Sequence, residues 1–262
     1  MVITSTKNER IKSLQKLAKS SERKKEEVFV IEGIRELEKA IHAGYTFNEV
    51  FFCPTVVSEE YINKIFGFDI LKTAVSHHVF ESIAYRENRD GIIALAKPKN
   101  LGLHDLNLSK NPLIIVLEAV EKPGNLGEML RTADAAGADA IIVCDPITDI
   151  YNPNVIRASL GCIFTKPVVC CKSEEAVQFF KNQKITTLAT TPDAKIVYFD
   201  QNLNKPVAII MGTEADGLSN YWLQNTDLQV KVPMLGIADS LNVSVCLSVV
   251  LYECVRQRLQ HK

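Results

Sequence analysis

Signatures of several common ligand sites are missing from this sequence of 262 residues. It contains no G-x-G-x-x-G, no G-x-x-x-x-G-K-[ST] and no G-x-S-x-G, so an ordinary dinucleotide site, a P-loop and a nucleophile elbow are not supported. The seven cysteines include no C-x-x-C pair, and the five histidines show no metal-ligand spacing. We therefore expect neither a disulfide framework nor a metal site, and reduced thiols indicate a cytoplasmic protein.

The sequence also lacks a strong charge imbalance and a long uninterrupted apolar run. The formal net charge is -1, so any contact with a nucleic acid must come from a local cluster of basic residues. The longest apolar run is interrupted by serines, and no membrane span is expected. Hydrophobic residues make up 47% of the chain, which is enough for one large domain or two small ones.

A local basic cluster lies between residues 5 and 25. Ile11, Leu14 and Leu17 recur there at helical spacing, which predicts an amphipathic helix. Two interpretations stay open: a solvated helix face, or an arm that binds the phosphates of RNA. The basic residues of this segment are Lys7, Arg10, Lys12, Lys16, Lys19, Arg23, Lys24 and Lys25.

Residues 1–100 are predicted to form a small α/β domain, which a polar, turn-rich linker separates from the range 111–262. In the second range, short apolar strands alternate with helical patterns, which indicates a parallel sheet with helices on both faces. Strands are predicted at 28–31, 50–53, 91–96, 113–117, 140–144, near 168, 185–189 and 207–211, and helices at 34–41, 59–66, 126–136, 155–160 and 174–182.

The last quarter of the chain contains an apolar helical pattern that opens at Asp239-Ser240, a pair suited to capping. Ser240, Ser244 and Ser248 follow at helical spacing and give one face of small residues. Such a helix packs closely in a core, which is the simplest interpretation. Asn242 favours a ligand site instead, because a buried amide needs partners for two donors and an acceptor.

Three loops that follow predicted strands carry the other unusual residues, at the edge where open α/β sheets bind ligands. In the first loop, Asn125 suits a helix N-cap and Arg131 an ordinary surface charge. The second loop contains Gly212 and Gly217, which permit positive φ or the close approach of a ligand. The third is the segment that leads to Asn242.

Taken in order, the three loops resemble the motifs of a known family. The stretch N-x-G-x-x-x-R-T-A at 125–133, G-x-E-x-x-G-L-S at 212–219 and P-M-x-G-x-x-x-S-L-N-V-S at 233–244 are similar to those of the SpoU (TrmH-like) RNA ribose 2'-O-methyltransferases of the SPOUT superfamily. The resemblance spans roughly 113–258. More loosely, residues 1–100 resemble the L30e-like RNA-binding domain often found ahead of it.

The resemblance implies a parallel-sheet α/β fold with a C-terminal trefoil knot, an exception to the rule against threaded loops. It also implies a homodimer whose active site lies near the interface, no metal, and S-adenosylmethionine as the cofactor, bound in the knot. By motif position, the cofactor-binding residues are Gly212, Val232 and Leu241, with Thr190, Met234, Ile237 and Ser240 as neighbours.

For catalysis, the resemblance assigns the central position to Arg131. A guanidinium stays protonated in proteins, so we expect Arg131 to orient the ribose 2'-hydroxyl and to stabilise developing alkoxide charge instead of removing the proton. Asn125, Glu214, Ser240 and Asn242 match the other polar positions of the motifs and would position the RNA or the loops.

These residues imply an enzyme that methylates a ribose 2'-hydroxyl, with ribosomal RNA as the preferred substrate by analogy of the N-terminal domain. Two alternatives stay open. One is a transfer-RNA methyltransferase of the same fold, with the same chemistry. The other is an RNA-binding protein without transfer activity, against which the presence of Arg131, Asn125, Glu214 and Asn242 argues.

Overall fold

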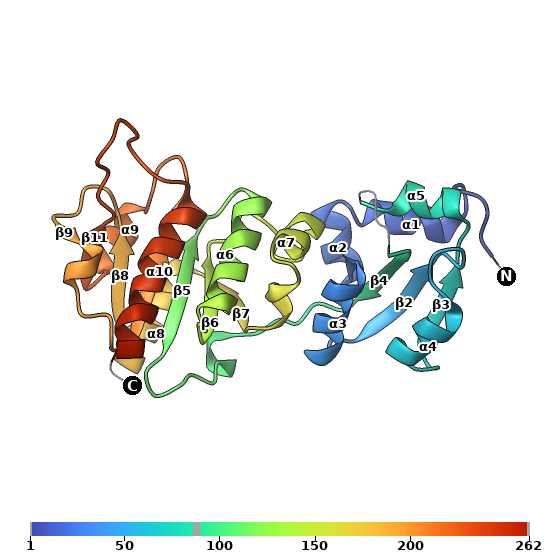
Figure 1. The fold of residues 1–262 in the computed structure, drawn as a ribbon, viewed down its shortest axis with the longest axis horizontal. Coiled ribbons are helices and arrows are strands. Elements are labelled where there is room, and N and C mark those ends of the chain that lie inside the picture. The colour runs from blue at the N-terminus through green and yellow to red at the C-terminus, as the bar shows by residue number, and fades with distance from the viewer. Residues whose placement is uncertain (1, 86–89, 261–262) are drawn as a thin grey trace. The chain divides into compact units, whose positions relative to one another are not determined.

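The fold comes from a computed structural model, which describes residues 2–85 and 90–260. The chain forms two compact units (Figure 1). Unit 1 comprises the described residues up to Lys99 together with Asp149–Thr165, and unit 2 comprises Asn100–Thr148 and the described residues from Lys166 onward. In the described part of the chain, no helix combines the length and the apolar character needed to span a bilayer.

Unit 1 is built on a mixed sheet with the strand order β1-β4-β2-β3. The strand β4 (Ile92–Ala96) pairs antiparallel with both β1 (Phe29–Glu32) and β2 (Phe47–Phe52), while β3 (Leu71–Ala74) lies parallel to β2. The helices of the unit are α1 (Glu9–Lys16), α2 (Ser20–Glu26), α3 (Ile34–His42), α4 (Glu59–Phe66), α5 (His77–Ile83) and α7 (Pro153–Ala158), followed by the short 3-10 turn η2 (Cys162–Phe164).

The helices α1 and α5 cover one face of this sheet. Ile11 and Leu14 of α1 pack with Val79 and Phe80 of α5 over Phe51 and its neighbours on the strands. The predicted basic helix is therefore correct in its apolar stripe and wrong in its continuity, since residues 5–25 form two helices. Its charges also divide, because most of the basic side chains are exposed whereas Arg23 is buried.

The segment Asp149–Thr165 completes unit 1, although the sequence analysis placed it in the range 111–262. The ring of Tyr151 stacks on Phe29 of β1, with ring centroids 4.2 Å apart, and Phe164 lies 6.1 Å from the same ring. Two aromatic contacts and a buried ion pair thus tie this segment to the first hundred residues. The ranges 1–100 and 111–262 stay predictions of functional domains.

Arg23 is the charged centre of that contact. Its guanidinium donates to Asp149 at 2.7 Å and to the carbonyls of Leu17 and Ala18 at 2.7 and 2.9 Å. The side chains of Arg23 and Asp149 are 3% and 14% exposed. A buried guanidinium with every contact in place is tolerated, whereas removal of one partner leaves a charge or carbonyls without compensation.

Unit 2 contains a parallel sheet with the strand order β7-β6-β5-β10-β8-β11-β9, as expected from the alternation of strands and helices. The strands are β5 (Leu113–Glu118), β6 (Ala140–Cys144), β7 (Val168–Cys171), β8 (Thr186–Thr190), β9 (Ile196–Val197), β10 (Val207–Met211) and β11 (Leu228–Lys231). The helices are α6 (Pro123–Ala135), α8 (Ser173–Gln183), α9 (Asn220–Asn225) and α10 (Val243–Gln260), with the 3-10 turns η1 (Leu103–Asp105) and η3 (Tyr198–Asp200).

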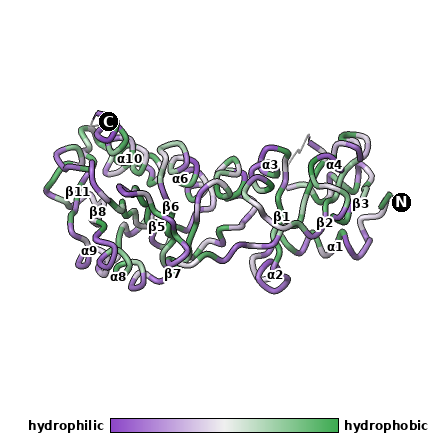
Figure 2. The backbone as a smooth tube through the Cα atoms, turned by 90° about the horizontal axis from the view of Figure 1, so that it is seen from below, coloured by the Kyte–Doolittle hydropathy of each residue, from purple (hydrophilic) through white to green (hydrophobic). Residues whose placement is uncertain are grey.

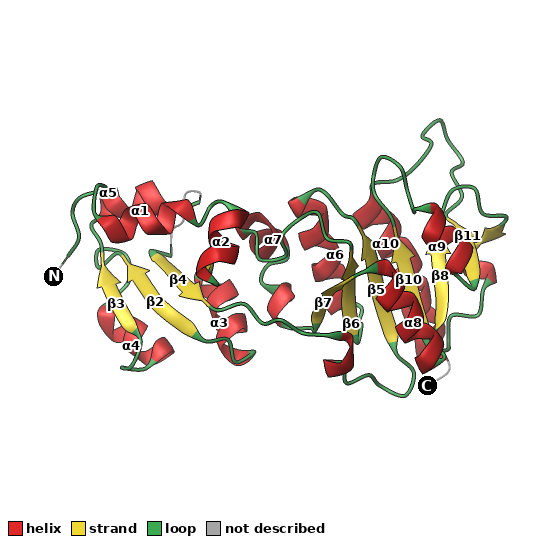
Figure 3. Cartoon of the chain, turned by 180° about the vertical axis from the view of Figure 1, so that it is seen from behind, coloured by secondary structure: helices red, strands yellow, loops and turns green. Residues whose placement is uncertain are grey.

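Helices cover both faces of this sheet (Figure 3). On one face, Val177 and Phe180 of α8 and Trp222 of α9 pack on Ile114, Ile142 and the neighbouring strand residues. On the other face, α10 packs along α6 and reaches β10. The strands β5 and β6 are buried along their whole length and stand out as apolar in Figure 2, which explains why the sequence predicted them.

The helix α10 begins at Val243, three residues later than the sequence predicted. Ser240 lies outside the helix, and Asn242 takes the capping position: its carbonyl accepts from Cys246 N at 2.8 Å and its side chain from Ser244 N at 2.9 Å. The helix is also not covered all round, because Val245 and Tyr252 are 47% and 49% exposed. The prediction that this helix packs in a core therefore holds for one side of α10 only.

We predict that Arg23→Ala lowers the free energy of unfolding by about 3–5 kcal/mol, because it leaves Asp149 buried without its partner. Urea unfolding followed by circular dichroism measures the loss. The control is Lys24→Ala, a neighbouring basic residue that is exposed and should change stability by no more than about 0.5 kcal/mol. Equal effects of the two substitutions would mean that the Arg23 contacts contribute nothing specific.

Candidate active site

The three loops singled out in the sequence meet at the carboxyl edge of the parallel sheet of unit 2. Thr190 ends β8, Gly212 directly follows β10, and Val232 directly follows β11. Because β8 pairs with both β10 and β11, these positions lie on neighbouring strands. Of the residues that the resemblance assigned to the cofactor, Thr190, Gly212 and Val232 are thus brought to one edge.

A chain of hydrogen bonds connects residues from all three motifs. Asn242 Nδ2 donates to Asn125 Oδ1 at 3.3 Å, and Asn125 Nδ2 donates to Glu214 Oε1. The other oxygen of Glu214 pairs with Lys122. Residues separated by 117 and 89 positions in sequence therefore hold one another in place.

The structure corrects one prediction about Asn125. The helix α6 begins at Pro123 with Lys122 at the N-cap position, so Asn125 lies inside the first turn and is not the cap. Its side chain is 9% exposed and is used for the contacts to Glu214 and Asn242. A buried amide with both ends bonded has one orientation, which suits a positioning role.

The helices α6 and α10 are also joined by side chains, of which Ser244 and Ser248 were singled out from the sequence and Glu128 and Thr132 were not. Ser244 Oγ donates to Glu128 Oε2 at 2.7 Å, and the hydroxyls of Thr132 and Ser248 lie 3.3 Å apart. The serine face of α10 is thus a polar seam and more than a face of small residues. The sequence signal for these contacts was the spacing of Glu128 and Thr132, which lie four residues apart and therefore on the same face of α6.

Glu118 was also missed. It ends β5, is 7% exposed, and its Oε2 accepts from Ser219 N at 2.9 Å. The contact anchors the end of the second motif to the central strand. A carboxylate that closes an otherwise apolar buried strand was the signal for it.

Gly212 and Gly217 shape the second loop as a close turn. A Cβ on Gly212 would lie 2.2 Å from the carbonyl carbon and oxygen of Gly217, so no side chain fits there. Gly217 has φ +69, and its carbonyl accepts from Thr213 N at 2.9 Å. Both expected uses of glycine, close approach and positive φ, are present.

Thr190 carries a polar atom that the fold does not use. Its Oγ1 is buried and has no hydrogen-bond partner among residues 2–85 and 90–260. Buried hydroxyls are nearly always bonded, so an unused one at the ligand edge of a sheet points to a missing partner molecule. The glycine turn and this hydroxyl fit a polar small molecule held there by backbone groups and by Thr190.

The other predicted residues are not gathered at this edge. Met234, Ile237, Ser240 and Leu241 lie on the loop 232–242, where Ile237 is fully exposed and Leu241 is 38% exposed. Arg131 is exposed on α6 and makes no hydrogen bond or ion pair to the described part of the chain. The roles of Arg131 and Ser240 stay predictions.

An open parallel α/β domain with a polar chain at its carboxyl edge, preceded by a second α/β unit, belongs to the class of proteins that bind a small molecule at a sheet edge. The sequence model of the SpoU rRNA Methylase family matches residues 112–252, and that of the MRM3-like substrate binding domain matches residues 8–94. The chain belongs to the SpoU rRNA methylase family.

Relatives of known sequence and structure agree. The 23S rRNA (guanosine(2553)-2'-O)-methyltransferase RlmP of Bacillus subtilis is 30% identical, over 95% of this chain and 97% of that protein. A crystal structure of an RNA 2'-O ribose methyltransferase is 40% identical with a TM-score of 0.85, covering 99% of this chain and 100% of the other. The AdoMet-bound rRNA methyltransferase from Sinorhizobium meliloti is 27% identical with a TM-score of 0.90, covering 98% and 97%.

We predict that Thr190→Val raises the free energy of unfolding of the ligand-free protein by about 1 kcal/mol, since it removes a buried hydroxyl that lacks a partner. The matched control is Thr187→Val on the same strand, where Oγ1 donates to Asp227 at 2.7 Å and accepts from Asp227 N at 2.9 Å. That substitution should cost about 1–3 kcal/mol. Urea unfolding compares them, and similar losses in both would show that the Thr190 hydroxyl is satisfied.

Proposed function

We propose that this chain is an S-adenosylmethionine-dependent methyltransferase that methylates a ribose 2'-hydroxyl in RNA, with ribosomal RNA as its substrate. The observation that carries the proposal is the hydrogen-bond chain Asn242–Asn125–Glu214 beside the glycine turn and Thr190. Membership of the SpoU rRNA methylase family and the ribosomal-RNA substrates named for its relatives support the choice of reaction and of RNA.

Gly212, Val232 and the Thr190 hydroxyl would hold the cofactor, and Leu241, Met234, Ile237 and Ser240 would join them from the loop 232–242. S-adenosylmethionine supplies a methyl group that its sulfonium already activates. The protein must then hold the ribose hydroxyl in line with that group and keep water away. Because Ile237 and its neighbour Leu235 are exposed in the free chain, the loop has apolar area available to cover a bound ligand.

Arg131 would act on the hydroxyl itself. Its guanidinium can donate to the ribose oxygen and stabilise the negative charge that develops there as the proton leaves. Asn125, Glu214 and Asn242 would keep the three loops in register around that position. In the described part of the single chain, Arg131 makes no hydrogen bond to these residues. This favours an active site that is completed at a subunit interface.

We therefore include a homodimer in the proposal. Val245, Val249 and Tyr252 form one face of α10 at helical spacing, and Val245 and Tyr252 are about half exposed. An apolar stripe of this kind is typical of a contact surface. The same helix bears the Asn242 cap and the Ser244 contact to α6, so the stripe is close in the chain to the proposed site.

The trefoil knot is likewise proposed, on the strength of the family. The C-terminal end of α10 is bonded to two other segments, because Arg258 donates to the carbonyls of Asn111, Pro112 and Lys205 at 2.8, 3.1 and 2.7 Å. Burial lowers the pKa of Arg258 from its usual value. A cytoplasmic location completes the proposal and is supported by free thiols at Cys53, Cys144 and Cys254.

The experiment that tests the function uses purified protein, labelled S-adenosylmethionine, and unmodified ribosomal and transfer RNA in separate tubes. Arg131→Ala should lower kcat about 10²–10³-fold, the effect of removing one donor to a developing oxyanion. Cofactor binding, measured by calorimetry, should not change. Lys181→Ala, an exposed cation on α8, is the control.

Each outcome has a distinct meaning. Label in the ribose of ribosomal RNA alone supports the proposal, and label in transfer RNA alone replaces the substrate class. Cofactor binding and RNA binding without any label favour a binding protein. An active Arg131→Ala variant would remove Arg131 from the proposed mechanism.

We predict that Val245→Glu shifts the protein from dimer to monomer in sedimentation velocity at micromolar concentration, because it places a charge in the apolar stripe of α10. The residue is 47% exposed, so the fold of the single chain should be retained. Gln224→Glu on the exposed surface of α9 adds the same charge elsewhere and should leave the dimer intact. A wild-type protein that sediments as a monomer contradicts the proposed contact.

A further inference from the structure

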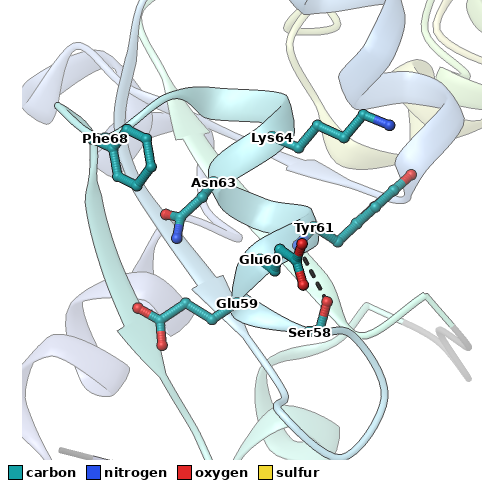
Figure 4. A pocket seen from close by; sticks show the side chains of 7 residues that line it. All are labelled: Ser58, Glu59, Glu60, Tyr61, Asn63, Lys64 and Phe68. Carbon is teal, nitrogen blue, oxygen red and sulfur yellow. Dashed lines mark hydrogen bonds between the residues drawn. The ribbon is translucent and has the colours of Figure 1, made fainter.

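Unit 1 carries an exposed aromatic ring in an open pocket that the proposed active site does not use. The pocket has a volume of about 750 Å³ and lies around α4 (Figure 4). Phe68, on the turn after α4, is 83% exposed. The remaining lining residues are Ser58, Glu59, Glu60, Tyr61, Asn63 and Lys64.

The fold of unit 1 does not require this ring. The core position at the end of α4 is taken by Phe66, which is 9% exposed and packs edge-on against Phe47 with centroids 5.1 Å apart. Gly67, at φ +72, then turns the chain so that Phe68 faces outward. Lys72 on β3 places its ammonium 5.6 Å from the centroid of the Phe68 ring. The ring of Phe68 is thus exposed to solvent beside a cation and is not part of a hydrophobic core.

Two polar side chains lie on the same side of α4 as the ring. Figure 4 shows Asn63 and Glu59 directed toward the side of Phe68, whereas Lys64 and Tyr61 point to the other side. Asn63 and Glu59 are four residues apart and therefore stack one turn above the other. Neither side chain makes a hydrogen bond within the part of the chain that the structure describes, so an amide and a carboxylate are available beside an open aromatic face.

We propose that this surface binds one unpaired nucleobase of the RNA substrate, which stacks on Phe68 while Asn63 and Glu59 contact its polar edge. Specific recognition of RNA commonly uses unstacked bases on aromatic side chains, with hydrogen bonds to their edges. The inference rests on the proposed function. It adds a substrate-binding subsite in unit 1, the unit that contains the match to a substrate binding domain.

The charges of the pocket favour a base over a phosphate. Its charged lining residues are two carboxylates, Glu59 and Glu60, and one cation, Lys64, so the backbone of RNA gains little there. A carboxylate accepts hydrogen bonds and donates none. Guanine presents neighbouring N–H donors on its pairing edge, and the amide of Asn63 can donate to its carbonyl oxygen. This pattern of donors and acceptors favours guanine among the four bases.

Steady-state methyl transfer to unmodified ribosomal RNA, with full-length protein and saturating cofactor, tests the subsite. Phe68→Ala and Phe68→Leu should each raise KM for RNA about ten-fold, within the range of effects found when a stacking side chain is removed, and leave kcat within about two-fold. Phe68→Trp retains a ring face and should keep KM near the wild-type value. Leu71→Ala, an exposed apolar residue of the same unit, is the matched control.

A second readout does not depend on catalysis. The protein has one tryptophan, Trp222, which is fully buried, so Phe68→Trp adds an exposed fluorophore. A uridine hexanucleotide with one central guanosine should quench it more strongly than an all-uridine hexanucleotide. Adding Glu59→Gln should remove that difference.

The outcomes separate the subsite from the reaction. Wild-type transfer with unchanged KM in Phe68→Ala, together with no quenching of Phe68→Trp, overturns the subsite and leaves the proposed function standing. An absence of transfer to any RNA overturns the proposed function, while guanosine-dependent quenching would still support base binding at Phe68. Equal quenching by both hexanucleotides overturns the selection of guanine.

Discussion

The carboxyl edge of the parallel sheet depends on the bond between two side-chain amides, that of Asn125, which is buried, and that of Asn242, which is exposed and not buried as the sequence predicted. A parallel sheet delivers its loops to one edge but does not fix how they approach one another. Here Asn242 caps α10 and reaches α6, and Asn125 passes the contact on to Glu214 after β10. The residue that caps α10 thus also fixes α10 against α6, although the two bonded residues lie 117 positions apart in the sequence. The glycine turn beside this chain closes on itself through Thr213 N and the Gly217 carbonyl, and Thr190 is placed by the pairing of β8 with β11.

Much of this architecture could be predicted from the sequence because the central strands are apolar on both faces. The strands Ala140–Cys144 and Val207–Met211 were placed at their observed ends, and the parallel order followed from their alternation with helices. The edges were harder. The strands β3 and β11 have few buried positions, and the helix α9 has only six residues. Their hydrophobic patterns were therefore too weak to predict them from the sequence. The packing of residues 149–165 in the compact unit of the first hundred residues could not be predicted, because stacking of Tyr151 on Phe29 leaves no local signal in the sequence.

The candidate site, too, could be predicted from the sequence only in part. Motif spacing identified Asn125, Glu214 and Asn242, which the fold joins, and it anticipated both uses of glycine at Gly212 and Gly217. It did not identify Glu118, Glu128 or Lys122, whose importance comes from partners distant in the chain. Neither the sequence nor a single chain places Arg131 against the other polar residues. Arg131 lies on an exposed face of α6, so its contacts depend on the molecule that covers this face and not on hydrogen bonds within the chain.

The insertion of Asp149–Thr165 into unit 1 has a consequence for how the protein is made. During synthesis the first hundred residues emerge well before Asp149, and until then Arg23 has no carboxylate and Phe29 no stacking ring. The N-terminal unit cannot finish folding until the first strands of the second unit, β5 and β6, have also emerged. Completion of unit 1 thus waits until Thr165 has been made, and loop closure over this distance slows that step. A polypeptide that stops before Asp149 leaves Arg23 without its carboxylate partner, and proteases and chaperones act on such incompletely folded chains.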